Sequence, residues 1–97
     1  MTYFFHDAAR VEHLEHVAYY EACQAGLGAR YLAAFDIAMS QVCATPERFY
    51  LESSPDIRRC RVPGFPYNIL YRRRRSEIEI LVVAPHRRRP GYWLGRS

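Results

Sequence analysis

The stretch "YNILYRRRRSEIEILVVA", residues 67–84, decides the fold. Residues 67–72 and 77–84 are rich in β-branched and aromatic side chains, which favour strands, and residues 73–76 between them are all polar, as in a turn. In the second segment the alternation predicts one buried face, which consists of Ile78, Ile80 and Val82. The pattern therefore predicts an antiparallel hairpin with one side against a core.

A third strand is expected immediately before this hairpin. The segment "IRRCRV" (57–62) is followed by the turn sequence "PGFP" (63–66). Three consecutive strands with short connections predict an antiparallel meander. Because side chains alternate along a strand, Arg59 and Arg61 are expected on the sheet face away from Cys60 and the core.

The N-terminal half has the period of helices. It begins with a short apolar run at residues 3–5, an expected opening strand. The predicted buried stripe of the first helix consists of Val11, Leu14, Ala18, Ala22 and Ala25. After Gly26 and Gly28, the second helix carries a stripe of Tyr31, Phe35, Ala38 and Val42. Residues 46–56 are expected to be a loop, and the short interhelix link predicts an antiparallel helical hairpin.

Together these elements predict an α+β fold in which an N-terminal helical hairpin packs on an antiparallel sheet of three to four strands. The length of 97 residues suits a single domain, residues 1–97. No apolar run approaches the ~20 residues that a membrane helix needs, and the N-terminus lacks the pattern of a secretory signal. We therefore expect no membrane partner and a cytoplasmic location.

The charges are distributed unevenly along the chain. Residues 1–57 hold three arginines and eight acidic residues, whereas residues 58–97 hold eleven arginines and two acidic residues. This asymmetry predicts one basic surface whose partner is anionic, either nucleic acid or an acidic protein segment. The three cysteines have neither CxxC nor zinc-like spacing, so no metal and no cofactor is expected.

The arginines after the last predicted strand are expected to join those of the preceding strands. The segment "APHRRRPGYW" (84–93) contains Arg87 and Arg88 and can fold back over the open sheet face beside Arg59 and Arg61. The guanidinium fork matches phosphate oxygens two at a time, so this arrangement favours a phosphate-binding concavity. An acidic peptide lying across the same face is the competing interpretation, because it would use the same chemistry.

Metal-free RNA cleavage on this face would need groups that move a proton, which arginine does not supply. His86 and Tyr92 are the candidates, since both lie close to the arginines in the sequence. Tyr92 and Trp93 could stack on a base, but a place for Trp93 in the core or in a protein contact is favoured. The other histidines are expected at the surface: His6, His13 and His16.

Several motifs occur in a characteristic order: "GLGARYLAAF" (26–35), "IRRCRV" followed by "FPYNILYR" (65–72), and "ILVVAPHRRRPGYW" (80–93). Together they resemble the RelE/ParE superfamily of toxins from type II toxin–antitoxin modules, often labelled plasmid stabilisation proteins. The resemblance covers nearly the whole chain and implies the same RelE/ParE-like fold. It also implies a cognate antitoxin whose acidic or amphipathic tail wraps the toxin, in a hetero-oligomer or beside a toxin homodimer.

Within this superfamily, RelE-like members bind the ribosome and cut mRNA, whereas ParE-like members act on DNA gyrase and cut nothing. The resemblance leads us to expect a ribosome-dependent, metal-independent mRNA endonuclease. Two alternatives stay open: a gyrase inhibitor without nuclease activity, and an inactive relative that only binds antitoxin.

Candidate catalytic residues follow from the residue chemistry and the resemblance: Arg59, Arg61, Arg87, Arg88, His86 and Tyr92. Residues expected to contact antitoxin or target are Arg58, Tyr67, Tyr71, Arg72 and Trp93. Two positions depart from the ribosome-cutting pattern. Asn68 stands where those members carry an arginine, and Pro85 takes the place of the usual histidine.

Overall fold

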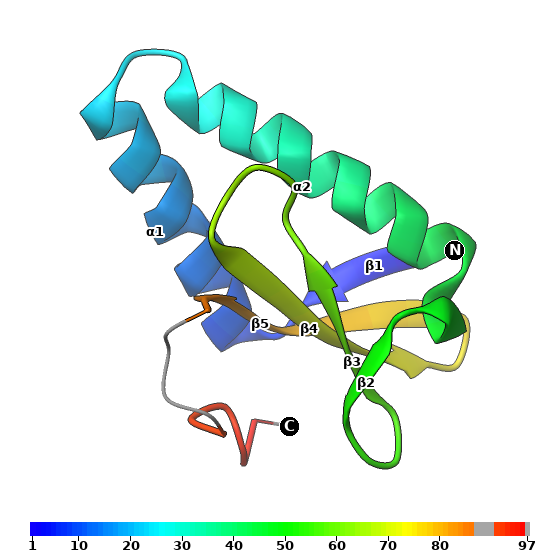
Figure 1. Ribbon diagram of the computed structural model, residues 1–97. Helices are drawn as coiled ribbons and strands as arrows, with labels where there is room; N and C mark the ends of the chain where they lie inside the picture. The colour runs from blue at the N-terminus through cyan, green and yellow to red at the C-terminus, as the bar shows by residue number, and fades with distance from the viewer. Residues whose placement is uncertain (87–90, 97) are drawn as a thin grey trace.

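The computed structural model of the chain describes residues 1–86 and 91–96 (Figure 1). A short strand precedes two helices, and four strands follow a single turn of 3₁₀ helix. The elements are β1 (Thr2–Phe5), α1 (Asp7–Cys23), α2 (Leu27–Ala44), η1 (Pro46–Arg48), β2 (Tyr50–Ser53), β3 (Ile57–Arg61), β4 (Tyr67–Arg74) and β5 (Glu77–Pro85). The predicted helical hairpin and the predicted three-stranded meander are both present.

The five strands form one mixed sheet in the order β1-β5-β4-β3-β2. Strands β2 to β5 pair antiparallel, whereas β1 pairs parallel with β5 at the edge. The expected antiparallel sheet of three to four strands is therefore only partly right. β2 lies within the segment predicted to be a loop. Its four residues were not recognised as a strand because they lie among Pro, Ser and Asp, which are typical of turns. The partner of β1 lies more than 70 residues away, so no local pattern announces it.

A β-bulge interrupts the pairing of β4 with β5. Tyr71 pairs with Ile80, but the preceding Leu70 pairs with Val82. Leu81 is therefore an extra residue in β5. One extra residue reverses the alternation of all side chains beyond it.

The bulge divides β5 between the two faces of the sheet. The side under the helices receives Ile78, Ile80 and Val83. The opposite side receives Leu81, Val82 and Ala84. The prediction that Val82 shares a face with Ile78 and Ile80 is wrong for this reason, because strict alternation held only up to the bulge.

The helical hairpin covers one face of the sheet (Figure 1), but α1 is rotated relative to the sequence prediction. Val11 and Leu14 are 55% and 58% exposed, so the predicted apolar stripe faces solvent. The buried residues of α1 are Ala9 and His13. The His13 ring lies 4.3 Å from the Phe35 ring, centroid to centroid, and its burial lowers its pKa. The expectation of a surface position for His13 is therefore wrong.

The link between the helices depends on the Glu21 carboxylate and on the close approach of α1 to Gly28. Glu21 accepts hydrogen bonds from the backbone N–H groups of Gly26 and Gly28, at 2.9 and 3.0 Å. It thereby caps the N-terminus of α2, where four N–H groups lack helical partners. Gly26 has a φ of 87°, in the left-handed region. A Cβ on Gly28 would lie 3.0 Å from the carbonyl oxygen of Val17, so glycine lets the helices meet closely.

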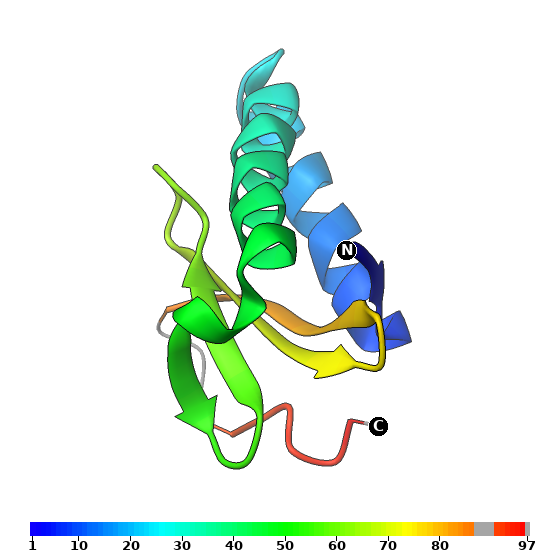
Figure 2. The ribbon, with the colours of Figure 1, turned by 90° about the vertical axis from the view of Figure 1, so that its right-hand side faces the viewer.

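Residues 91–96, which we call the C-terminal segment, lie on the sheet face opposite the helices (Figure 2). Trp93 is 8% exposed and belongs to a small apolar cluster on that face. The cluster is completed by Leu70, Leu81, Val82 and Ala84. The sheet is thus covered on both sides, by a larger core beneath the helices and a smaller one beneath the C-terminal segment.

Two matched substitutions test this assignment of faces. Leu81→Ala should lower the free energy of unfolding by about 2–5 kcal/mol, because Leu81 is 1% exposed and leaves a cavity. Leu14→Ala should change it by no more than about 0.5 kcal/mol, because the side chain already meets water. Urea unfolding measures both values. A large loss for Leu14→Ala would mean that α1 buries its apolar stripe after all.

Candidate functional site

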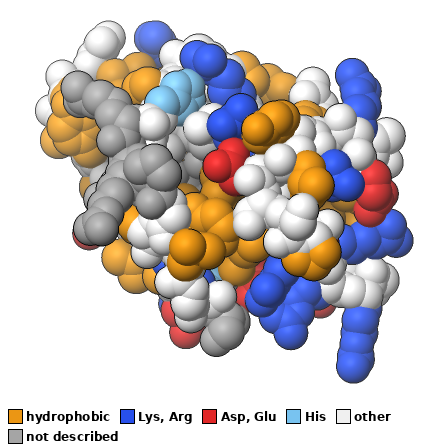
Figure 3. Space-filling view, turned by 60° about the horizontal axis from the view of Figure 1, so that its bottom comes forward, with side chains coloured by type: hydrophobic (Ala, Val, Ile, Leu, Met, Phe, Trp, Pro, Cys, Tyr) orange, Lys and Arg blue, Asp and Glu red, His pale blue; other side chains and the backbone are white. Residues whose placement is uncertain are grey.

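The alternation along β3 places Arg59 and Arg61 on the sheet face that carries the C-terminal segment, as predicted. Cys60 between them is buried on the opposite side, in the core under the helices. In the sheet, Arg59 pairs with Leu70 and Arg61 pairs with Asn68. Figure 3, which brings the underside of Figure 1 forward, shows apolar side chains with arginines on several sides of them.

We use the name arginine face for the surface formed by Arg48, Arg59, Arg61, Asn68 and His86, which line one hollow of about 610 Å³. Arg59, Asn68 and His86 also line a second hollow of about 190 Å³, whose other wall is the C-terminal segment. The second hollow is smaller than the ~300 Å³ at which small-molecule pockets begin. The second hollow therefore suits a single anionic group, whereas the first has the volume of a small-molecule site.

Arg59 makes an ion pair and an aromatic contact on this face. Its Nη1 lies 3.1 Å from Oε1 of Glu52, and its guanidinium lies 4.4 Å from the centroid of the Tyr50 ring. The ion pair is exposed, with 41% and 32% of the two side chains accessible. Exposed pairs contribute only about 0–1 kcal/mol, so an incoming anion can displace Glu52.

The C-terminal segment stands beside these cations, as the sequence predicted. Trp93 and Tyr92 line the second hollow together with Arg59. The hydroxyl of Tyr92 donates a 2.7 Å hydrogen bond to Oε2 of Glu12 in α1. The candidate residues Arg87 and Arg88 lie outside the described residues, so their proposed roles remain predictions.

Glu12 holds its negative charge firmly. Burial alone would raise the pKa of its carboxyl, but hydrogen bonds from Arg96, Tyr92 and the Val83 N–H outweigh burial and hold it below its usual value. Because Glu12 stays ionised, the Tyr92 hydroxyl keeps an acceptor for its proton at neutral pH. Tyr92 is therefore engaged in a structural contact at the edge of the arginine face.

The remaining arginines of β4 form a separate group at the tip of the β4–β5 hairpin. Arg72 and Arg74 contact Glu79 at 2.9 and 3.1 Å, and Arg73 contacts Glu47 at 3.2 Å. Burial opposes the ionisation of Glu79, but the two arginines lower its pKa overall. The hairpin tip lies at the other end of β4 from Asn68, so these arginines form a group separate from Arg59 and Arg61.

Several residues expected to contact a partner make contacts within the fold. Tyr71 is 1% exposed, and its hydroxyl donates to the carbonyl oxygen of Pro46 at 2.7 Å. Arg58 donates to the carbonyl oxygen of Phe49 at 2.8 Å and points to the helix side. Tyr67 is 7% exposed within the core. In this conformation Tyr67 and Tyr71 offer almost no surface to a partner.

Sequence reasoning missed three residues that shape this site. Arg48 and Glu52 belong to η1 and β2, the segment predicted to be a plain loop. Glu12 reaches residues 71 to 84 positions away in the chain. Only the position of β2 on the sheet and the return of the chain end bring them together, and neither feature has a local sequence signal.

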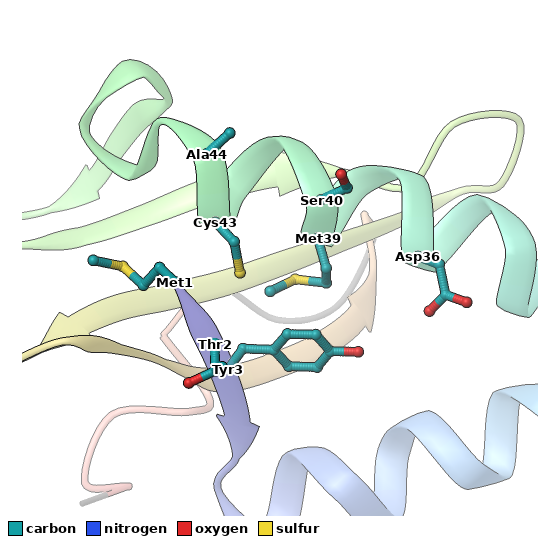
Figure 4. Close-up of a pocket in the computed structure, with 8 residues that line it drawn as sticks. All are labelled: Met1, Thr2, Tyr3, Asp36, Met39, Ser40, Cys43 and Ala44. Atoms are coloured by element: carbon teal, nitrogen blue, oxygen red, sulfur yellow. The ribbon is translucent and has the colours of Figure 1, made fainter.

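A different hollow lies between β1 and the C-terminal half of α2 (Figure 4). Its apolar lining includes Met1, Met39 and Cys43, and the Asp36 carboxylate lies at one end. Burial and the nearby Asp36 charge raise the pKa of Tyr3 on the β1 side. Among residues 1–86 and 91–96 no arginine lines this hollow, so it does not extend the arginine face.

Two features are absent from residues 1–86 and 91–96. No group of three or more His, Cys, Asp or Glu side chains is arranged there to hold a metal ion. Within the same residues, no helix has the length and apolar character needed to cross a bilayer.

Comparison with known proteins supplies the family. Residues 3–90 match the family model described as the ParE toxin of the type II toxin–antitoxin system parDE. A search of curated proteins finds no match. The match spans most of the 97 residues and includes both helices, β2 to β5 and all of β1 except Thr2. Such a toxin has a cognate antitoxin as its partner. The chain therefore belongs to the ParE toxin family of type II toxin–antitoxin systems, within the RelE/ParE superfamily.

Proposed function

We propose that this toxin acts by binding and blocking its target, as an inhibitor of DNA gyrase, through the arginine face and the C-terminal segment. The supporting observation is that the polar groups of this surface are arranged for contact. Arg59 carries a weak, displaceable ion pair with Glu52, and the Tyr92 hydroxyl is bound to Glu12. The family supports the same proposal, since ParE-like members of the superfamily are expected to act on gyrase.

The contrast with nuclease chemistry rests on proton transfer. Metal-free RNA cleavage needs a base, an acid and cations around the phosphate. Among the described residues of the arginine face, His86 is the one imidazole, and the nearby Cys60 thiol has its pKa raised by burial to about 11. Asn68 contributes a neutral amide where ribosome-cutting members carry an arginine. These side chains can bind a phosphate group, but few of them can transfer the protons that RNA cleavage requires.

The composition of the surface favours a protein target. Arginine and aromatic side chains are enriched where proteins bind one another, and the most important contacts combine the two around an apolar centre. Here Arg59 lines one hollow with Leu70, Tyr92 and Trp93, and Arg61 lines the neighbouring one.

A ribosome-dependent mRNA endonuclease is the second candidate function. It is favoured by one specific observation: His86 shares a hollow with Arg59 and Arg61. An imidazole beside two guanidinium groups is a combination that can bind and activate a phosphodiester.

Pulse labelling of newly made DNA and protein separates the two functions. In bacteria that express this chain alone, DNA synthesis should fall first, within minutes, and protein synthesis should follow later. Purified toxin should also inhibit supercoiling by purified gyrase and leave ribosome-bound mRNA intact. An earlier fall in protein synthesis, together with cut mRNA, would replace the gyrase proposal by the nuclease. Normal synthesis of both would indicate an inactive relative.

A charge reversal tests whether the antitoxin covers the same surface. Arg59→Glu combined with Arg61→Glu should reduce both toxicity and antitoxin affinity by about 100-fold or more, because an acidic antitoxin tail would then meet like charges. Growth after induction and calorimetry give the two values. Arg73→Glu combined with Arg75→Glu is the matched control, since it makes the same charge change at the hairpin tip. Lost toxicity with undiminished antitoxin affinity would count against a shared face.

A further inference from the structure

The C-terminal segment consists of turns and is itself neither a strand nor a helix. Its apolar contact is Trp93, which covers Leu70, Val82 and Ala84. Tyr92 and Arg96 donate side-chain hydrogen bonds to Glu12, so both residues reach α1 on the far side of β5. The position of the segment is therefore set by α1 as well as by the sheet.

These polar contacts converge on one carboxylate. Oε2 of Glu12 accepts from the Tyr92 hydroxyl at 2.7 Å and from Nη2 of Arg96 at 2.9 Å. Oε1 accepts from the Val83 N–H at 3.0 Å and from Nη1 of Arg96 at 3.1 Å. Four donors fill the acceptor capacity of a carboxylate, and the two-point fork of Arg96 also fixes its direction.

Arg96 ties the same site to the strand. Its Nη1 donates to the carbonyl oxygen of Leu81 at 2.8 Å, and its guanidinium lies 5.1 Å from the centroid of the Tyr92 ring. The Arg96–Glu12 pair is well shielded, with 17% and 16% of the side chains accessible. Shielding makes this pair much less sensitive to salt than the exposed pair of Arg59 with Glu52.

We propose that Glu12 is a positioning residue for the functional surface: by binding Tyr92 and Arg96 together, it fixes the C-terminal segment as the wall of the hollow beside Arg59. Glu12 itself does not line this hollow. It acts through Tyr92 and Trp93, which line the hollow. This role rests on the proposed function only in so far as the surface is the one that binds the toxin's target.

The charged environment of Glu12 keeps the contact closed at neutral pH. The groups that face it are Arg96 and Tyr92 from the C-terminal segment and the Val83 N–H from β5, with His16 one turn further along α1. The pKa of Glu12 lies below its ordinary value of 4.5. A depressed pKa means that the stabilisation is fully present above the ordinary carboxyl pKa and is lost as the pH falls below it.

Trp93 provides a direct test, because it is the single tryptophan of the chain and lies within the C-terminal segment. Glu12→Gln should shift the Trp93 emission to longer wavelength and increase its quenching by acrylamide. Arg96→Gln should do the same while leaving the bond between Glu12 and Val83 in place, so it remains informative if Glu12→Gln folds poorly. Glu15→Gln is the control, since it removes one carboxylate from an exposed position of the same helix.

The functional readout is the induction level that halves growth. Glu12→Gln and Arg96→Gln should each raise it about tenfold, and the double variant should raise it no further, because both changes release the same segment. Far-UV circular dichroism should remain that of the wild type. A merely structural role would instead predict additive losses that follow the melting temperature.

The outcomes separate this inference from the proposed target. Unchanged Trp93 emission in both variants would overturn the positioning role, and so would a released segment with full toxicity. Neither the growth assay nor the fluorescence assay depends on which target the toxin binds, so a failure of the assay with purified gyrase and wild-type toxin would reject the target and leave the role of Glu12 standing.

Discussion

The uncovered edge of β5 is the constraint on which the arrangement depends. β1 pairs with β5 only as far as Ile80, and within the described part of the chain no strand neighbours the backbone beyond that point on this side. α1 runs along the edge and supplies side chains instead: Glu12 accepts from the Val83 N–H, and His16 donates to the Val83 carbonyl oxygen at 2.7 Å. Buried backbone groups need such partners. The helix therefore turns these polar residues inward, and its alanine-rich stripe faces solvent.

This constraint also marks the limit of what the sequence could predict about the fold. The helical hairpin and the β3–β5 meander follow from local periodicity, because neighbouring segments pair with one another. The face of α1, the parallel pairing of β1 and the bulge at Leu81 depend on contacts between distant segments. The spacing of apolar residues favoured Leu14 for the core. That spacing does not reveal that the backbone at the edge of β5 needs Glu12 and His16 as hydrogen-bond partners.

The same division holds for the functional surface. The alternation in β3 correctly placed Arg59 and Arg61 opposite Cys60, and the return of the chain end correctly placed Tyr92 and Trp93 beside Arg59. Composition alone could not show that the charge run of β4 would be compensated by Glu47 and Glu79 at the hairpin tip. It also could not show which acid would meet which arginine, since these pairs are settled by the sheet register.

The bulge in β5 limits the kinds of mutation that this part of the gene can tolerate. Ile80 faces one cluster and Val82 the other, with Leu81 as the extra residue between them. Exchanging one apolar residue for another preserves both clusters, at a modest cost in packing. Deleting or inserting a single codon here would send Val83 to the wrong side and break both clusters at once. Selection should therefore conserve the length of this strand more strictly than the identity of its residues.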